Sequence, residues 1–253
     1  LKVVVAERLA LIVNNTYLNL EYYDSIWLIL IAIFYSFQIY SDFAGYTYIA
    51  IGAAKIMGFD LMNNFNTPYL AVSITDFWSR WHMSLTNWFK DYLYIPLGGN
   101  RKGKVRKYIN IFIVFLLSGL WHGASWHFVA WGVIHGILRI FDDITVNIRK
   151  KISKALGFGD DLASNAFRMC ITFILVCLAW VFFRAQSIGQ AVAIIKNMFK
   201  WNPWVLTDGS LLEVGLDAME LNVLVVSLIV LLITDICRYK NINLLELKNY
   251  IDR

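Results

Sequence analysis

The sequence is poor in charged residues, proline and cysteine. Only 16% of its 253 residues are Asp, Glu, Lys or Arg, whereas 58% are hydrophobic. Soluble domains carry about 25% charged residues, so the chain has too few charges to cover a water-facing surface. Its high apolar content excludes a disordered chain, and three cysteines are too few for a disulfide scaffold. The composition therefore predicts a polytopic membrane protein, and the apolar runs described below predict that it is all-α.

The net charge of +5 is explained by the way a membrane protein distributes its basic residues. The basic residues form short clusters beside apolar runs, which is how membrane proteins mark their cytoplasmic side. We therefore expect a lipid bilayer around the chain and no nucleic-acid partner. Cys170, Cys177 and Cys237 all lie within apolar runs and are interpreted as small buried hydrophobes. The chain opens at Leu1 without a signal peptide, so we expect residues 1–253 to be the C-terminal portion of one longer membrane domain.

Several apolar runs approach the roughly 20 residues that a spanning helix needs. Arg168 to Phe183 and Leu221 to Cys237 are the cleanest single spans. Ile26 to Tyr40 is also apolar, but the polar and small residues at 41–45 predict a break before a second apolar stretch at 46–59.

Residues 108–140 form a less ordinary apolar segment. As one helix they would measure roughly 50 Å at about 1.5 Å per residue, against a hydrocarbon core of about 30 Å. Basic clusters at 101–107 and 149–154 flank the segment. If both clusters are cytoplasmic, the chain enters and leaves on the same side, as a re-entrant hairpin or a pair of short helices.

The middle of this segment is rich in glycine and aromatic residues. Broken backbone at membrane depth is tolerated only where it is buried in protein or lines a wet cavity. We therefore expect the wall of a cavity or tunnel at Ser118, Gly119, Trp121, His122 and Gly123.

Residues 75–94 have the apolar spacing of an amphipathic helix, with Thr75 or Asp76 as its N-cap. His82 is unusual because it falls on the apolar stripe of that helix. Arg80 is interpreted first as the partner of a carboxylate such as Asp76 or Asp91, and second as a contact for an anionic group of substrate or lipid.

Two further polar features have competing interpretations. Asp42 is either a polar group of a cavity wall or an N-cap for a helix that begins near Phe43, and the N-cap is favoured. His127 and His135 are eight residues apart and share one helical face, but no neighbouring ligands suggest a metal site.

No nucleophile elbow and no phosphate-binding glycine fingerprint is present in the sequence. A neutral histidine in a buried cavity could instead act as general base towards a bound hydroxyl, with a second polar group to stabilise the oxyanion. Transport through the same cavity would leave a similar pattern.

Four stretches carry a resemblance to a known family. They are FQIYSDFAGYTYIAIGAAKIMGF (37–59), FWSRWHMSLTNWFKDYLYIPLGGNRKG (77–103), SGLWHGASWHFVAWGVIHG (118–136) and LAWVFFRA (178–185). The chain resembles the membrane-bound O-acyltransferase (MBOAT) family, in the branch of the alginate O-acetylases and peptidoglycan O-acetyltransferases. The resemblance covers most of residues 1–190.

This resemblance implies an O-acetyltransferase built as a ring of helices around a tunnel. The family pairs a membrane histidine with a polar residue about forty positions earlier, and the matching residues here are His122 and His82. The resemblance assigns His122 as general base and His82 as the group that orients it or polarises the acyl carbonyl. Trp81, Trp121 and Trp126 would shape the tunnel.

The resemblance also implies the substrates and surroundings of the protein. The acyl donor would be acetyl-CoA, the acceptor an extracytoplasmic polysaccharide, and the partner an acetyltransferase of SGNH-hydrolase type. No metal and no tightly bound cofactor is implied, and the protein would be a multi-pass protein of the bacterial inner membrane. Two alternatives remain: D-alanyl transfer to teichoic acid within the same family, and a polytopic transporter or flippase, although no inverted repeat is visible.

Overall fold

The computed structural model describes residues 1–23, 25–155, 157, 159, 161–200 and 216–242, and within these ranges the chain contains helices and turns but no strand. Short π-helical turns form η1 (Lys2–Ala6) and η4 (Lys90–Tyr94), and 3-10 turns form η2 (Leu20–Tyr22) and η3 (Pro68–Leu70). The α-helices of the described residues are α1 (Glu7–Leu18), α2 (Ser25–Ile56), α3 (Ile74–Arg80), α4 (Met83–Phe89), α5 (Gly103–His122), α6 (Trp126–Ala155), α7 (Leu162–Arg184), α8 (Ile188–Met198) and α9 (Ala218–Tyr239). The expected all-α architecture is confirmed.

Three helices of the described part, α2, α7 and α9, are long and apolar enough to cross a membrane. The apolar helices expected at 168–183 and 221–237 are therefore present, as parts of α7 and α9. The break expected at residues 41–45 is wrong, because α2 continues through it as one helix. Its small residues instead allow a close contact: a Cβ atom on Gly45 would lie 3.2 Å from the backbone nitrogen of Lys2.

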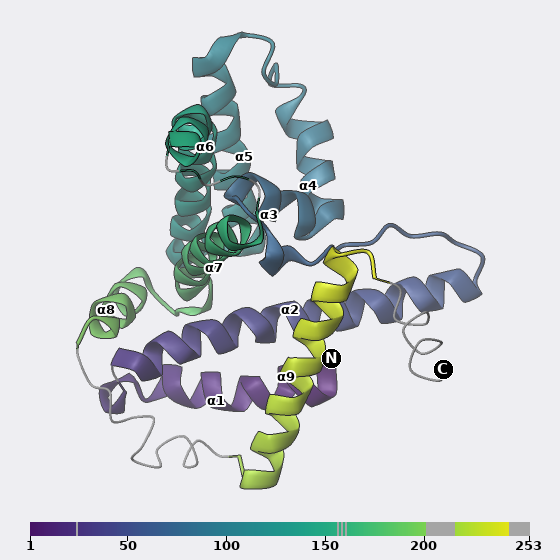
Figure 1. Ribbon diagram of the computed structural model, residues 1–253, viewed down its shortest axis with the longest axis vertical. Helices are drawn as coiled ribbons and strands as arrows, with labels where there is room; N and C mark the ends of the chain where they lie inside the picture. The colour runs from purple at the N-terminus through teal and green to yellow at the C-terminus, as the bar shows by residue number, and fades with distance from the viewer. Residues whose placement is uncertain (24, 156, 158, 160, 201–215, 243–253) are drawn as a thin grey trace.

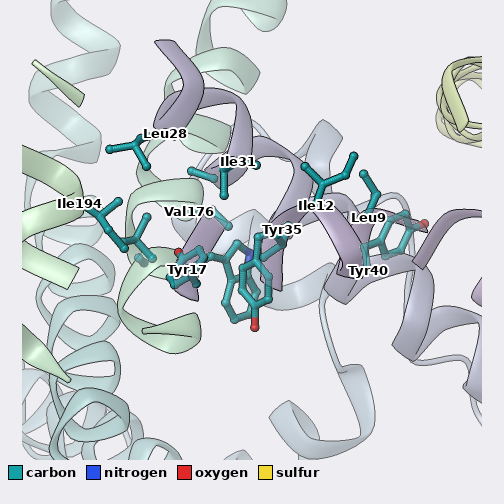
Figure 2. Packing of buried hydrophobic residues seen from close by; sticks show 14 of the residues in the cluster. Leu9, Ile12, Tyr17, Leu28, Ile31, Tyr35, Tyr40, Val176 and Ile194 are labelled. Atoms are coloured by element: carbon teal, nitrogen blue, oxygen red, sulfur yellow. The ribbon is translucent and has the colours of Figure 1, made fainter. Parts of the chain in front are cut away.

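The main hydrophobic core lies where α1, α2, α7 and α8 meet. Figure 1 shows α1 and α2 side by side, with α9 crossing them. Apolar side chains from the four helices gather between them in Figure 2, and they include Leu9, Ile12, Leu28, Ile31, Val176 and Ile194. This core holds α2 and α7 in the positions from which both contribute to the site described below.

Helices α5 and α6 form the expected hairpin, which stands apart from the α1–α2 pair in Figure 1. The helical backbone breaks after His122 and resumes at Trp126, within the glycine-rich stretch where a break was predicted. A pair of short helices is nevertheless wrong, because α6 continues for 30 residues through the basic cluster 149–154. Lys107 pairs with Asp143 at 2.7 Å near the open end of the hairpin, so both basic clusters lie at that end.

Glycine allows the two helices of the hairpin to touch through their backbones. A Cβ atom added to Gly119 would lie 2.4 Å from the carbonyl oxygen of Phe128, and one added to Gly132 would lie 2.4 Å from that of Phe115. Small residues of this kind allow close helix packing in membrane proteins. The glycine expected in a cavity wall at position 119 therefore forms a helix contact.

The single amphipathic helix expected over residues 75–94 is wrong. The chain instead forms α3 and α4, separated at Trp81 and His82, and continues into η4. The N-cap of α3 is Ser73, whose hydroxyl accepts a hydrogen bond from the backbone N–H of Asp76 at 3.1 Å. The helical periodicity of the sequence did not reveal the break, because His82 takes a left-handed backbone conformation that side-chain patterns do not encode.

We predict that Gly132→Ala destabilises the protein by about 1–3 kcal/mol, the usual range for overpacking a well-packed contact. The new methyl group would meet backbone atoms of α5, which cannot move aside as a flexible side chain can. The thermal unfolding midpoint of the purified full-length protein measures the effect. Gly52→Ala in α2 is the control, because no atom lies within 4 Å of its added Cβ. Equal midpoints for both variants would contradict the close helix contact.

Candidate active site

A pocket of about 180 Å³ lies between α2, α3, α4, α5 and α7. Most of its wall is aromatic or aliphatic, so its few polar groups stand out against an apolar background. The lining residues are Ile39, Asp42, Phe43, Trp78, Trp81, His82, Leu85, His122, Trp180 and Phe183.

His82 reaches the pocket because the backbone turns sharply at this residue. Its φ and ψ angles of 45° and 53° are left-handed, a conformation that is uncommon for residues other than glycine. Asn64 fixes the next turn twice: its carbonyl oxygen accepts the N–H of Met83 at 3.0 Å, and its side-chain oxygen accepts the N–H of Ser84 at 3.1 Å. The segment that precedes η3 thus fixes the connection between α3 and α4 through these two hydrogen bonds.

The imidazole of His82 packs edge-on against Phe43, with ring centroids 4.6 Å apart. Its Nδ1 atom lies 3.4 Å from the hydroxyl oxygen of Ser84. Burial lowers the pKa of His82 to about 4, so the ring is neutral at pH 7. A neutral imidazole offers one N–H donor and one acceptor nitrogen.

His122 is the last residue of α5, immediately before the hairpin break. Its ring is surrounded by Trp121, Trp131 and Phe183, with centroid separations of 4.9, 5.1 and 5.0 Å. None of the hydrogen bonds found among the described residues involves its imidazole, although the ring lines the pocket. A ring nitrogen that has no partner among these residues is available to a hydroxyl group that enters the pocket.

The fold thus brings together two histidines that are 40 residues apart in the sequence. Trp81, the other residue expected beside His82, is buried in the pocket wall and packs against Trp180 with ring centroids 5.1 Å apart. The pairing of a ring that can accept a proton with a second polar ring suits the transfer of a proton and the stabilisation of a developing charge.

The other two tryptophans expected in the tunnel lie differently. Trp121 has 59% of its surface exposed and contacts both His82 and His122 without lining the pocket. Trp126 begins α6 with 77% of its surface exposed. The tunnel role of both residues stays a prediction.

Asp42 lines the pocket and also pairs with Lys2 at 2.6 Å. Its interpretation as an N-cap is wrong, since the residue lies inside the continuous helix α2. Arg80 pairs with Asp76 at 2.7 Å, which confirms the preferred interpretation of that residue. The guanidinium of Arg80 also stacks on the ring of Tyr239 in α9, 5.5 Å from its centroid.

The remaining histidines are structural groups of the helix packing. His127 and His135 are both buried, and their Nδ1 atoms lie near the carbonyl oxygen of Phe182 at 3.2 Å and the indole nitrogen of Trp78 at 3.3 Å, respectively. Among the residues that the structure describes, no three His, Cys, Asp or Glu side chains gather as a metal site would require.

The three cysteines are free thiols, but they are not uniformly buried as expected. Cys177 is buried, with its sulfur 3.1 Å from the hydroxyl of Ser36, whereas Cys170 is exposed and Cys237 half-buried. Position within an apolar run did not predict burial because one side of α7 faces away from the core.

Sequence reasoning missed a buried carboxylate behind the pocket. Asp235 of α9 accepts a hydrogen bond from the hydroxyl of Tyr40 at 3.2 Å, and both residues are buried. The ring of Tyr40 packs in turn against Phe65 and Trp81. An ionisable residue inside an apolar span is itself a signal, and Asp235 was the acidic residue within the span expected at 221–237.

Comparison with known proteins gives one family. Residues 11–188 match the sequence profile of MBOAT, the membrane-bound O-acyltransferase family. The chain is 40% identical over 228 residues to a probable alginate O-acetylase of Pseudomonas fluorescens, an alignment that covers 89% of this chain and 43% of the relative. It is 43% identical over 168 residues to a peptidoglycan O-acetyltransferase of Helicobacter pylori, covering 66% of this chain and 31% of the relative.

A more distant similarity links the chain to a teichoic acid D-alanyltransferase of Streptococcus thermophilus. That alignment has 32% identity and covers 59% of this chain and 39% of the relative. The chain therefore spans less than half the length of each of these three relatives.

Alanine is usually more stable than glycine inside a helix, but the left-handed backbone at His82 predicts the opposite order of stability at this position. His82→Gly should be more stable than His82→Ala by about 1 kcal/mol, because only glycine adopts this conformation without strain. At Thr86, inside α4, alanine should instead be more stable than glycine by about 0.5–1 kcal/mol. Thermal unfolding midpoints of the four variants measure both differences, and the same order at both positions would contradict the left-handed turn.

Proposed function

The chain belongs to the membrane-bound O-acyltransferase family, and we propose that it carries the reaction pocket of an enzyme that transfers an acetyl group to a hydroxyl of an extracytoplasmic polysaccharide. The single observation that carries this proposal is that His82 and His122 line one small apolar pocket. The names of the relatives with about 40% identity support acetyl as the group transferred and a polysaccharide as the acceptor.

His122 acts as the general base. Its free ring nitrogen accepts the proton of the acceptor hydroxyl while the hydroxyl oxygen attacks the carbonyl carbon of the acetyl thioester. A new C–O bond forms, the C–S bond breaks, and the departing thiolate receives the proton from the His122 imidazolium. General bases of this kind contribute about 100-fold to 10,000-fold in rate.

His82, which lines the same pocket, supports this step. Its neutral ring can donate one hydrogen bond to the carbonyl oxygen, on which negative charge develops during the attack. The surrounding rings of Phe43, Trp180 and Phe183 exclude water, which strengthens that hydrogen bond and limits hydrolysis of the thioester.

The donor in this proposal is acetyl-CoA, which reaches the pocket from the cytoplasm. Acyl transfer from a thioester supplies its own leaving group and therefore needs no resident metal or cofactor. The acceptor would enter from the other face, either directly or through an SGNH-type partner acetyltransferase. The protein would lie in the bacterial inner membrane as a multi-pass protein, with His82 and His122 facing a tunnel between the two sides.

We predict that His122→Ala lowers acetyl transfer from labelled acetyl-CoA by at least about 100-fold in the full-length protein. His82→Ala should lower it by about 10-fold to 1,000-fold, because one donor to the developing charge is lost. His127→Ala is the matched control, since that ring contacts the carbonyl of Phe182 and does not line the pocket.

Wild-type transfer by folded His122→Ala protein would contradict the assignment of the base. Transfer of D-alanine from a carrier thioester, without transfer of acetyl, would favour the teichoic-acid chemistry named for the more distant relatives. Movement of an unmodified solute without acyl transfer would favour a transporter.

The hairpin geometry also predicts the membrane topology. Single cysteines placed at Lys102 and Lys151 should react with an impermeant maleimide from the same side of the membrane, because both residues belong to the open end of the α5–α6 hairpin. Labelling in intact cells and in inverted vesicles distinguishes the sides. Labelling of the two positions from opposite sides would refute the arrangement.

A further inference from the structure

Helix α3 is attached to α6 by the buried carboxylate of Asp142. One oxygen of this carboxylate accepts the backbone N–H of Thr75 at 3.0 Å and also the hydroxyl of Thr75. The other oxygen pairs with the guanidinium of Arg149, and only 8% of the Asp142 side chain is exposed. Thr75 and Asp142 are 67 residues apart, so this is a tertiary contact and not a local cap.

The attachment to Asp142 is needed because α3 is too short to be a stable helix without tertiary contacts. A helix of seven residues is far below the length at which helices are stable alone. Its first N–H groups lack helical partners, and here Ser73 satisfies that of Asp76 while Asp142 satisfies that of Thr75. A carboxylate at a helix N-terminus also interacts favourably with the helix dipole.

A second contact fixes the rotation of α3 about its axis. The indole N–H of Trp78 donates a hydrogen bond to Nδ1 of His135 at 3.3 Å. On α6, His135 precedes Asp142 by two helical turns, whereas on α3 Trp78 lies about one turn after Thr75. Two polar contacts at separate points leave α3 little freedom to slide along α6 or to rotate.

The end of α3 leads directly into the pocket. Trp78 lines the pocket from within α3, and Trp81 and His82 follow the last residue of the helix. The other histidine, His122, is carried by α5, which touches α6 through Gly119 and Gly132. Helix α6 is therefore the common support from which both histidines are placed.

We propose that Asp142 is a positioning residue that holds α3, and with it His82, in register with His122. It does not line the pocket, and it acts only through the placement of α3. This inference rests on the proposed function of the histidine pocket. Misplacement of a catalytic group by about 1 Å can cost about 100-fold in rate, so loss of the attachment should appear in turnover.

The test compares Asp142→Ala with Asp142→Asn in the full-length protein, using acetyl-CoA as the donor. Asp142→Ala should lower kcat by about 10-fold to 100-fold while the KM for acetyl-CoA changes by less than about 2-fold, because the geometry of the reacting groups is altered and not the binding of the donor. Asp142→Asn keeps an amide oxygen for the Thr75 donors and should retain kcat to within about 3-fold.

Asp143→Ala is the matched control. This neighbouring carboxylate of α6 pairs with Lys107 at 2.7 Å and Arg139 at 3.8 Å, and the interactions found for it do not reach α3. Its removal costs a comparable ion pair and should leave kcat per folded molecule unchanged. The folded fraction is measured by size-exclusion chromatography of each variant.

Three results would overturn the proposal: wild-type kcat in Asp142→Ala, an equal loss in Asp143→Ala, or an Asp142→Asn variant as impaired as Asp142→Ala. If Asp142→Ala does not fold, Thr75→Val replaces it, since that change removes only the hydroxyl donor. It should lower kcat at constant KM, and a wild-type kcat would overturn the proposal.

The experiments distinguish failure of the positioning role of Asp142 from failure of the proposed acetyl transfer. An inactive His122→Ala protein together with a fully active Asp142→Ala protein would reject the positioning role and leave the reaction pocket standing. An active His122→Ala protein would reject the proposed function itself.

Discussion

The backbone contact between α5 and α6 is the constraint on which the candidate site depends. Two glycines, Gly119 and Gly132, allow each helix to meet a carbonyl group of the other without an intervening side chain. This contact fixes the position of α5 along α6, and therefore the position of His122, which is the last residue of α5. The same helix α6 then receives α3 on another of its faces through Asp142 and His135. Both histidines are thus placed relative to one helix.

The pocket is apolar because the elements around it supply aromatic side chains. Rings from α2, α3 and α7 surround the two imidazoles, so the polar groups operate where water is scarce. Burial lowers the pKa of His82 to about 4 and keeps its ring neutral at physiological pH. A neutral His82 ring beside a His122 ring in an apolar pocket suits a reaction in which a proton moves while charge develops on a carbonyl oxygen. A second buried layer, Tyr40 with Asp235, supports the wall from α9.

Much of this arrangement follows from the sequence, and the exceptions have physical causes. Apolar length predicted the long helices α7 and α9, and a glycine-rich interruption predicted the hairpin break after His122. The break expected at Asp42 failed because small residues in a helix mark a close neighbour as readily as a helix end, and Gly45 faces η1. The break at His82 was missed because its left-handed backbone is imposed by Asn64, a tertiary partner that periodicity does not reveal. The carboxylates of Asp142 and Asp235 were likewise missed, because their partners lie far away in the sequence.

The central claim is that the acetyl thioester reacts in the pocket shared by His82 and His122. The most direct measurement is a cryo-electron microscopy structure of the full-length protein with a non-hydrolysable thioether analogue of acetyl-CoA. The account predicts the acyl end of the analogue between Phe43, Trp180 and Phe183, with its carbonyl oxygen near His82 and its carbonyl carbon facing His122. An analogue bound elsewhere, with no part of it in this pocket, would contradict the account.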